Sequence, residues 1–149
     1  MNIEEEIKQQ KFTNLSVKAG INILYTSSYI NNHQSKIFKK FGLTGPQFNV
    51  LRILRGQLPN PATINLIIDR MLDKSSNASR IVEKLRLKNY IERVQCPEDR
   101  RAVNVKITEK GLDILKPLDE MENVFFGGLN NLNDNELTLL NELLNKIRI

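Results

Sequence analysis

Residues 73–111 constrain the fold of this chain more than any other segment, because three structural patterns follow one another there. Apolar residues at three- and four-residue steps predict an amphipathic helix over about 75–88. Alternating apolar residues then predict a strand returning from a tight loop, so residues 90–107 are expected to form a hairpin. Thr108 is a good residue to begin the next helix. A helix, a hairpin with a basic tip and a second helix are the order of a winged helix-turn-helix.

The first 40 residues contain no proline and a single glycine. Their irregularly spaced apolar residues predict one long helix over about 10–40, and an interruption at Gly20 or at residues 31–33 stays open. So long a helix cannot bury its apolar face within one small domain. We therefore expect a partner helix from a second copy of the chain.

Helix-start signals divide the rest of the chain. Thr44 and Gln47 form a capping box that predicts a helix to about residue 57, and Thr63 is expected to cap a short helix to about residue 72. The helix from Thr108 should run to about residue 126 with a proline inside it, and Asn133 starts a last helix with leucines at packing intervals.

The predicted fold class is mainly α with a small β-hairpin, in one domain over residues 1–149. We expect a winged helix-turn-helix core at 43–108, flanked by N- and C-terminal dimerisation helices at 1–41 and 109–149.

Composition excludes several classes of protein. A composition of 40% hydrophobic and 26% charged residues argues against both a disordered chain and a membrane-spanning one. The polar, acidic N-terminus does not resemble a secretory signal. A single cysteine, Cys96, rules out an internal disulfide and suits a reducing cytoplasm, so we expect a cytoplasmic protein.

The net charge of +5 is unevenly distributed. Residues 74–116 hold eleven basic and six acidic residues, whereas residues 117–149 hold two basic and six acidic ones. A basic middle and an acidic C-terminal third suit a chain that meets nucleic acid with one part and something else with the other. The charge alone is equally compatible with an ordinary soluble surface.

The predicted helix at 75–88 carries residues suited to reading bases in the major groove. Such readout needs short polar side chains near the N-terminal end of the inserted helix. We expect Ser75 to cap the helix, Arg80 to pair with guanine, and Asn77 to be either a base contact or a helix-start residue. The candidate readout residues are Ser76, Asn77, Ser79 and Arg80. The candidate phosphate contacts are Lys74, Lys84, Arg86, Lys88 and Arg93.

The hairpin tip, or wing (residues 96–102), holds two adjacent arginines. A narrow minor groove attracts arginine because its negative potential is enhanced. Arg100 and Arg101 are therefore candidate minor-groove contacts, and Asp99 is expected to hold the Arg101 guanidinium in an ion pair.

These motifs resemble the MarR family of bacterial winged-helix regulators. The family's Asp-x-Arg-x-x-x-Val-x-x-Thr-x-x-Gly pattern stands here from Asp99 to Gly111, and its Ser-x-x-Ser-Arg pattern ends at Arg80. The Leu-Thr-x-x-Gln-Phe-x-Val-Leu pattern begins at Leu43. One departure is Asn89, which stands where the family usually has glycine.

The resemblance implies an obligate homodimer that binds a pseudo-palindromic double-stranded DNA operator and regulates transcription. It implies a recognition helix in the major groove and Arg101 in the minor groove. By family habit the protein would be a repressor relieved by a small-molecule effector, whose binding residues the sequence does not identify.

The leading alternative is a winged-helix module that binds an acidic protein partner without DNA specificity. An enzyme is not expected, because the chain has no glycine-rich phosphate loop and no nucleophile beside a histidine base. A lone histidine, His33, without a Cys/His cluster predicts no metal site, and no cofactor is expected. Cys96 is expected to be inert rather than redox-sensing.

Overall fold

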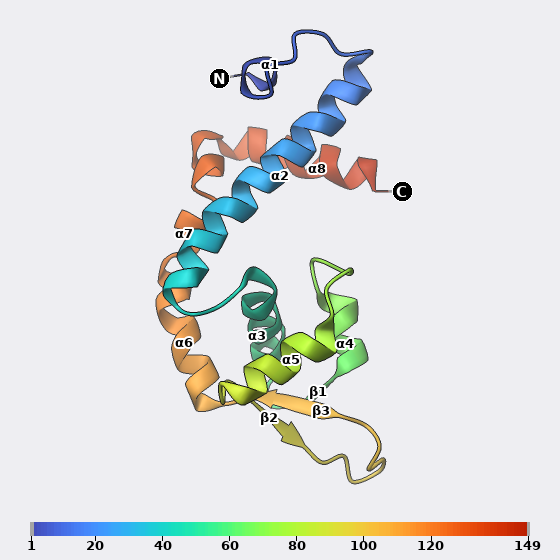
Figure 1. Ribbon diagram of the computed structural model, residues 1–149, viewed down its shortest axis with the longest axis vertical. Helices are drawn as coiled ribbons and strands as arrows, with labels where there is room; N and C mark the ends of the chain where they lie inside the picture. The colour runs from blue at the N-terminus through green and yellow to red at the C-terminus, as the bar shows by residue number, and fades with distance from the viewer. Residues whose placement is uncertain (1, 149) are drawn as a thin grey trace.

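The computed structural model describes residues 2–148. It divides into a group of terminal helices and a winged-helix core that lies beyond the end of the long helix α2 (Figure 1). The elements, in chain order, are α1 (Ile3–Glu6), α2 (Leu15–Lys40), α3 (Gly45–Gln57), β1 (Ala62–Thr63), α4 (Ile64–Arg70), α5 (Ala78–Leu87), β2 (Ile91–Val94), β3 (Asn104–Ile107), α6 (Glu109–Glu120), α7 (Glu122–Phe125), η1 (Gly127–Asn131) and α8 (Asp134–Ile147).

The long N-terminal helix begins later than predicted and is not interrupted. Asn14 caps α2 by accepting a hydrogen bond from the Val17 N–H at 2.9 Å, so the helix starts at Leu15 rather than near residue 10. It then continues through Gly20 and through residues 31–33 to Lys40. The interruption that the sequence left open does not occur.

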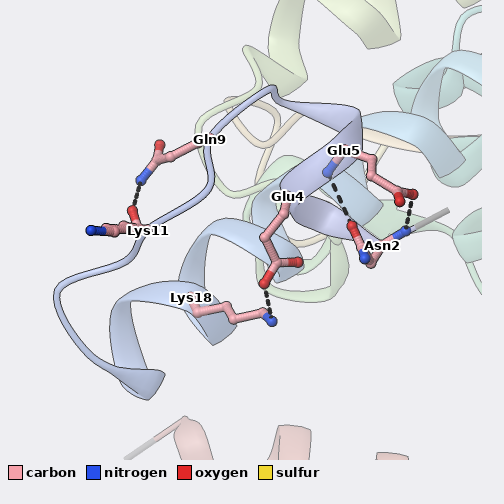
Figure 2. Close-up of polar contacts among 6 residues, drawn as sticks. All are labelled: Asn2, Glu4, Glu5, Gln9, Lys11 and Lys18. Carbon is pink, nitrogen blue, oxygen red and sulfur yellow. Dashed lines mark hydrogen bonds and ion pairs between the residues drawn. The ribbon is translucent and has the colours of Figure 1, made fainter.

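A separate short helix that the sequence did not predict precedes α2. Asn2 and Glu5 form a reciprocal capping box at the start of α1, and Glu4 forms an ion pair with Lys18 of α2 (Figure 2). Ile3 is buried, and Tyr25 donates a hydrogen bond to Glu6 at 2.6 Å. These contacts hold the N-terminal segment against the beginning of α2.

The winged-helix core is built around α3. The capping box of Thr44 and Gln47 forms as predicted, and Val50, Leu51 and Leu54 of α3 are almost fully buried. Helices α4 and α5 add further apolar side chains to the same core. Burial of these aliphatic side chains, at about 1.5–3 kcal/mol each, is what holds the three helices together.

The sheet has three antiparallel strands in the order β1-β3-β2, one more than the predicted hairpin. Strands β2 and β3 form the hairpin, with Ile91 opposite Ile107 and Arg93 opposite Val105. The third strand is the dipeptide at 62–63, and it pairs with β3 through Ala62 and Val105. Both strands of the hairpin are shorter than expected, and Val103 is exposed in the loop before β3.

The C-terminal helices differ in detail from the sequence prediction. Thr108 caps α6 as expected, and Pro117 lies inside it, but the helix ends at Glu120 and a separate turn, α7, follows it. The paired glycines at 127–128 begin a 3₁₀ turn. Asn133 starts α8 as predicted, and it forms a capping box with Glu136.

Helix α8 has no buried residue of its own, although it is rich in leucine. Leu139, Leu143 and Ile147 are all more than half exposed, and α8 crosses α2 in Figure 1. Along α2, Leu15 and Leu24 are also largely exposed. Exposed apolar surface of this kind is typical of an interaction site rather than of a surface that stays in contact with solvent.

Candidate nucleic-acid interface

A turn precedes α5, and because of it the helix starts later than predicted. Asp73 accepts hydrogen bonds from the backbone N–H of Ser75 at 2.9 Å and from its hydroxyl at 2.6 Å, and from the Ser76 hydroxyl at 3.2 Å. These bonds, led by that of the Ser75 hydroxyl, hold the pKa of Asp73 below its ordinary value. They fold residues 73–76 into a turn, so α5 spans Ala78–Leu87 rather than about 75–88.

Asn77, not Ser75, caps α5. Its side-chain carbonyl accepts a hydrogen bond from the Arg80 N–H at 3.0 Å, which satisfies one of the free donors at the helix start. The prediction that Ser75 caps the helix was therefore wrong, because α5 begins at Ala78 and the residue before it is Asn77. Of the two roles left open for Asn77, the structure shows the helix-start role, and its amide Nδ2 points to no protein acceptor among residues 2–148.

A second contact fixes the turn to the core. Asn49 of α3 accepts a hydrogen bond from the Leu72 N–H at 3.0 Å, and Lys74 donates to the last carbonyls of α4, at Ile68 and Asp69. The prediction of Lys74 as a phosphate contact is weakened, because its ammonium group already caps α4. The turn and the start of α5 are thereby held in one geometry.

Three polar side chains on the solvent face of α5 have no hydrogen-bond or ion-pair partner among residues 2–148. Ser79, Arg80 and Lys84 are exposed, whereas Ala78, Val82 and Leu85 are buried on the opposite side. Within residues 2–148, neither Arg80 nor Lys84 takes part in an ion pair. The predicted readout residue Arg80 and the predicted phosphate contact Lys84 are thus free to meet a ligand.

Three other predicted phosphate contacts have partners in the protein. Lys88 donates to the Gly42 carbonyl. Arg86 binds Glu83 through two hydrogen bonds at 2.6 and 3.0 Å, and Arg93 of β2 binds the same carboxylate at 3.1 Å. The Arg86 hydrogen bonds, with a smaller effect from Arg93, hold the pKa of Glu83 below its ordinary value. Sequence reasoning missed this cluster, although the three-residue spacing of Glu83 and Arg86 on one helix was a signal for half of it.

The wing extends between β2 and β3 and is longer than predicted, since the strands end at Val94 and resume at Asn104. The Asp99 carboxylate accepts a hydrogen bond from the backbone N–H of Arg101 at 2.9 Å. The expected ion pair between Asp99 and the Arg101 guanidinium is absent from the ion pairs of the described residues. Asp99 therefore shapes the loop backbone and leaves both Arg100 and Arg101 exposed.

The start of α5 and the tip of the wing project toward the same side of the winged-helix core, on the right in Figure 1. On α5 and the wing, four exposed cations have neither an ion-pair nor a side-chain hydrogen-bond partner among residues 2–148. These are Arg80, Lys84, Arg100 and Arg101.

Asn89 has the left-handed conformation that its position demands, with φ of 61°. Asparagine tolerates this conformation, so the departure from glycine is accommodated. The turn brings the end of α5 to β2, and the Thr108 hydroxyl donates to the Asn89 carbonyl at 2.7 Å.

The lone histidine and the lone cysteine lie in different parts of the fold. The His33 Nε2 lies 3.0 Å from the Val124 carbonyl oxygen and links α2 to α7, while Cys96 is a half-buried free thiol at the base of the wing. Over residues 2–148, no group of three or more His, Cys, Asp or Glu residues is placed to hold a metal ion. No helix within these residues combines the length and apolar character needed to cross a membrane.

Comparison with known proteins agrees with this architecture. The MarR family model matches residues 41–102. The HTH-type transcriptional regulator MhqR of Bacillus subtilis (strain 168) is 30% identical over 143 residues, which cover 91% of this chain and 92% of the relative.

Solved structures show the same fold. A mutant MarR from E. coli, complexed with operator DNA, superposes with a TM-score of 0.77 at 23% identity over 99% of both chains. The organohalide-sensing regulator RdhR, in its 2,4-dichlorophenol-bound form, gives a TM-score of 0.81 at 20% identity, covering 94% of this chain and 85% of that one. With one relative 30% identical along almost its entire length and a family model matched over the winged-helix core, the chain belongs to the MarR family.

Proposed function

We propose that the protein is a sequence-specific, double-stranded DNA-binding transcriptional regulator that works as a homodimer in the cytoplasm. The observation that carries the proposal is the set of exposed cations without acidic partners among residues 2–148, on α5 and on the wing. Family membership supports the same function, as does the similarity in fold to a MarR protein complexed with operator DNA.

In this proposal, α5 enters the major groove with its capped end foremost. Arg80 pairs with the O6 and N7 atoms of a guanine, and Ser79 contacts a neighbouring base or phosphate. The Asn77 amide group is available as a further donor while its carbonyl keeps the helix capped. Lys84, one turn further along, binds a phosphate.

The turn before α5 takes a supporting role. Ser75 and Ser76 were predicted to contact DNA, but their hydroxyls donate to Asp73. Each hydroxyl oxygen still has lone pairs, yet phosphate oxygens need donors. We therefore propose that these two serines position α5, and that only the backbone of the turn approaches a phosphate.

The wing is proposed to lie along the minor groove. Asp99 fixes the loop backbone at Arg101, and the guanidinium of Arg101 inserts where the groove is narrow. Arg100 is proposed to contact the adjacent phosphate. Pairing each wing with one α5 gives one half-site for each subunit.

Dimerisation is proposed to bury the apolar faces of α2 and α8 against a second copy of the chain. Residues 1–41 and 109–149 form the dimer in this division, and residues 43–108 bind DNA. A two-fold axis between the subunits then requires a pseudo-palindromic operator whose half-sites lie about one helical turn apart. The exposed leucines of α8 support this arrangement.

Regulation is proposed to be repression that a small-molecule effector relieves. The organohalide-sensing relative in its 2,4-dichlorophenol-bound form supports an effector of small, apolar character. No catalytic role is proposed.

The experiment is binding of the purified protein to the intergenic DNA beside its own gene, measured by fluorescence anisotropy at two salt concentrations with unrelated duplex as competitor. We expect binding that survives the competitor and weakens with salt, with a log–log slope of about −0.9 for each phosphate contact. Binding that the unrelated duplex abolishes would contradict sequence specificity.

The second candidate, a winged-helix module for an acidic protein partner, rests on the same exposed cations. It predicts no binding to either duplex at low salt by a folded dimer. The same experiment therefore separates the two functions.

A further inference from the structure

One acidic side chain on α5 connects this helix to strand β2 of the hairpin that carries the wing. Glu83 binds Arg86 of its own helix with both carboxylate oxygens, at 2.6 and 3.0 Å, and binds Arg93 of β2 at 3.1 Å. Its carboxylate is thus shared between a helix residue and a strand residue. Within the described residues, it is the ion-paired bridge between α5 and the hairpin.

The position of Arg93 places this bridge close to the point where the wing begins. Arg93 lies opposite Val105 in the ladder, one residue from the end of β2, and Val105 is fully buried in the core. Beyond Val94 the wing has no strand pairing until Asn104. Glu83 therefore holds β2 at Arg93, one residue before its pairing with β3 ends and the loop that carries Arg101 begins.

We propose that Glu83 is a positioning residue that couples the two DNA contacts, orienting the wing relative to α5 so that Arg101 reaches the minor groove when Arg80 lies in the major groove. The inference rests on the proposed DNA-binding function and deepens it. It concerns how one subunit places two elements on adjacent grooves, and it does not require Glu83 to touch DNA.

A positioning role explains why an acidic residue lies beside the proposed DNA-binding surface. The Glu83 side chain is 41% exposed, and an acidic group near phosphate opposes binding. Two arginines surround it, so the cluster keeps a net charge of +1 while its geometry is fixed by three hydrogen bonds. Arg93 remains 62% exposed and keeps donors for a phosphate.

The alternative is that Glu83 only weakens binding by repulsion. The two explanations predict opposite results for removal of the charge. Repulsion alone predicts that Glu83→Gln binds operator more tightly and leaves the contribution of Arg101 unchanged. Positioning predicts that the contribution of Arg101 shrinks.

The test is a double-mutant cycle on the full-length dimer, with operator affinity measured by fluorescence anisotropy. The four proteins are the wild type, Glu83→Gln, Arg101→Ala and the double variant. We expect Arg101→Ala to weaken binding by more than about tenfold in the wild-type background and by less than about threefold in the Glu83→Gln background, as coupled residues behave. Equal weakening in both backgrounds would overturn the proposal.

Two further variants separate positioning from loss of charge or of fold. Arg93→Gln breaks the bridge from the strand side and should reduce the effect of Arg101→Ala in the same way. The charge swap Glu83→Arg with Arg93→Glu keeps the net charge of the cluster and should restore that effect. Failure of the swap to restore it, with thermal unfolding unchanged from the wild type, would count against positioning.

Glu92→Gln is the matched control. Glu92 is an exposed carboxylate on the same strand and joins no ion pair among residues 2–148. The Glu92→Gln substitution removes the same charge without touching the bridge, so Arg101→Ala should still weaken binding by more than about tenfold in that background. If wild-type protein binds no operator, the proposed function fails; if it binds but shows no coupling, only this inference fails.

Discussion

A methyl group on Gly111 would lie 2.3 Å from the backbone carbonyl oxygen of Tyr90. The same carbonyl accepts a hydrogen bond from the Thr108 N–H at 3.0 Å, and Ile107 lies on the other side, 2.6 Å from the position of that methyl group. The first turn of α6 therefore packs directly on the turn that ends α5. This contact joins the winged-helix core to the C-terminal helices.

Gly111→Ala should destabilise the protein, because the backbone at Tyr90 cannot move away without disturbing the start of β2. We expect a loss of about 1–3 kcal/mol in the free energy of unfolding, measured by urea denaturation. Gly56→Ala in α3 is the control, since no atom lies within 4 Å of its added methyl group and alanine favours helix. Unchanged stability of Gly111→Ala would contradict the close packing.

The helical framework could be predicted from the sequence because its signals are local. The capping boxes at Thr44 and Asn133, the cap at Thr108 and the left-handed Asn89 all form as local chemistry dictates. The third strand could not be predicted, since a two-residue strand has no periodicity of its own and exists only through its pairing with Val105.

Asn77→Ala should weaken both folding and DNA binding. The variant loses the hydrogen bond to the Arg80 N–H, and loss of such a cap costs about 0.5–2 kcal/mol. Because Arg80 lies in the first turn, a frayed helix start also displaces its side chain. Ser75→Ala should have a smaller effect on stability, since Ser75 does not cap the helix. Thermal unfolding and operator binding of the two variants measure this difference, and a larger loss from Ser75→Ala would contradict the assignment of the cap.

Arg101→Ala should weaken operator binding by more than about tenfold while leaving the dimer folded, because its guanidinium makes no ion pair within residues 2–148. Arg55→Ala is an informative comparison. Arg55 binds Asp119 at 2.6 and 3.0 Å and connects α3 to α6, so its removal should affect stability more than DNA contact. Wild-type affinity in Arg101→Ala would remove the wing from the mechanism.

Leu143→Glu should dissociate the dimer. Leu143 is 51% exposed on the unburied apolar face of α8, and a carboxylate there would have to be desolvated in the interface. Thr138→Glu adds the same charge on another face of the same helix and should leave the dimer intact. Sedimentation analysis distinguishes the two, and a dimeric Leu143→Glu protein would place the interface elsewhere.

The candidate site was predicted less completely than the fold. Exposed Arg80 and Arg101 could be selected from their motifs, but their neighbours depend on which side chains pair after folding. Asp73 competes for the serines of the turn, and Asp99 binds a backbone N–H where an ion pair was expected. Glu83 contacts Arg93 only because the hairpin returns beside α5, and the sequence around either residue does not predict that contact.

The most direct test of the account is selection of bound duplexes from a random DNA library by the wild-type protein, with Arg80→Ala selected in parallel. The account predicts a pseudo-palindromic consensus with half-sites about one helical turn apart, and it predicts that Arg80→Ala loses preference at one base pair of each half-site, at a cost of about 1–3 kcal/mol. Enrichment of no sequence by a folded, dimeric wild-type protein would contradict it.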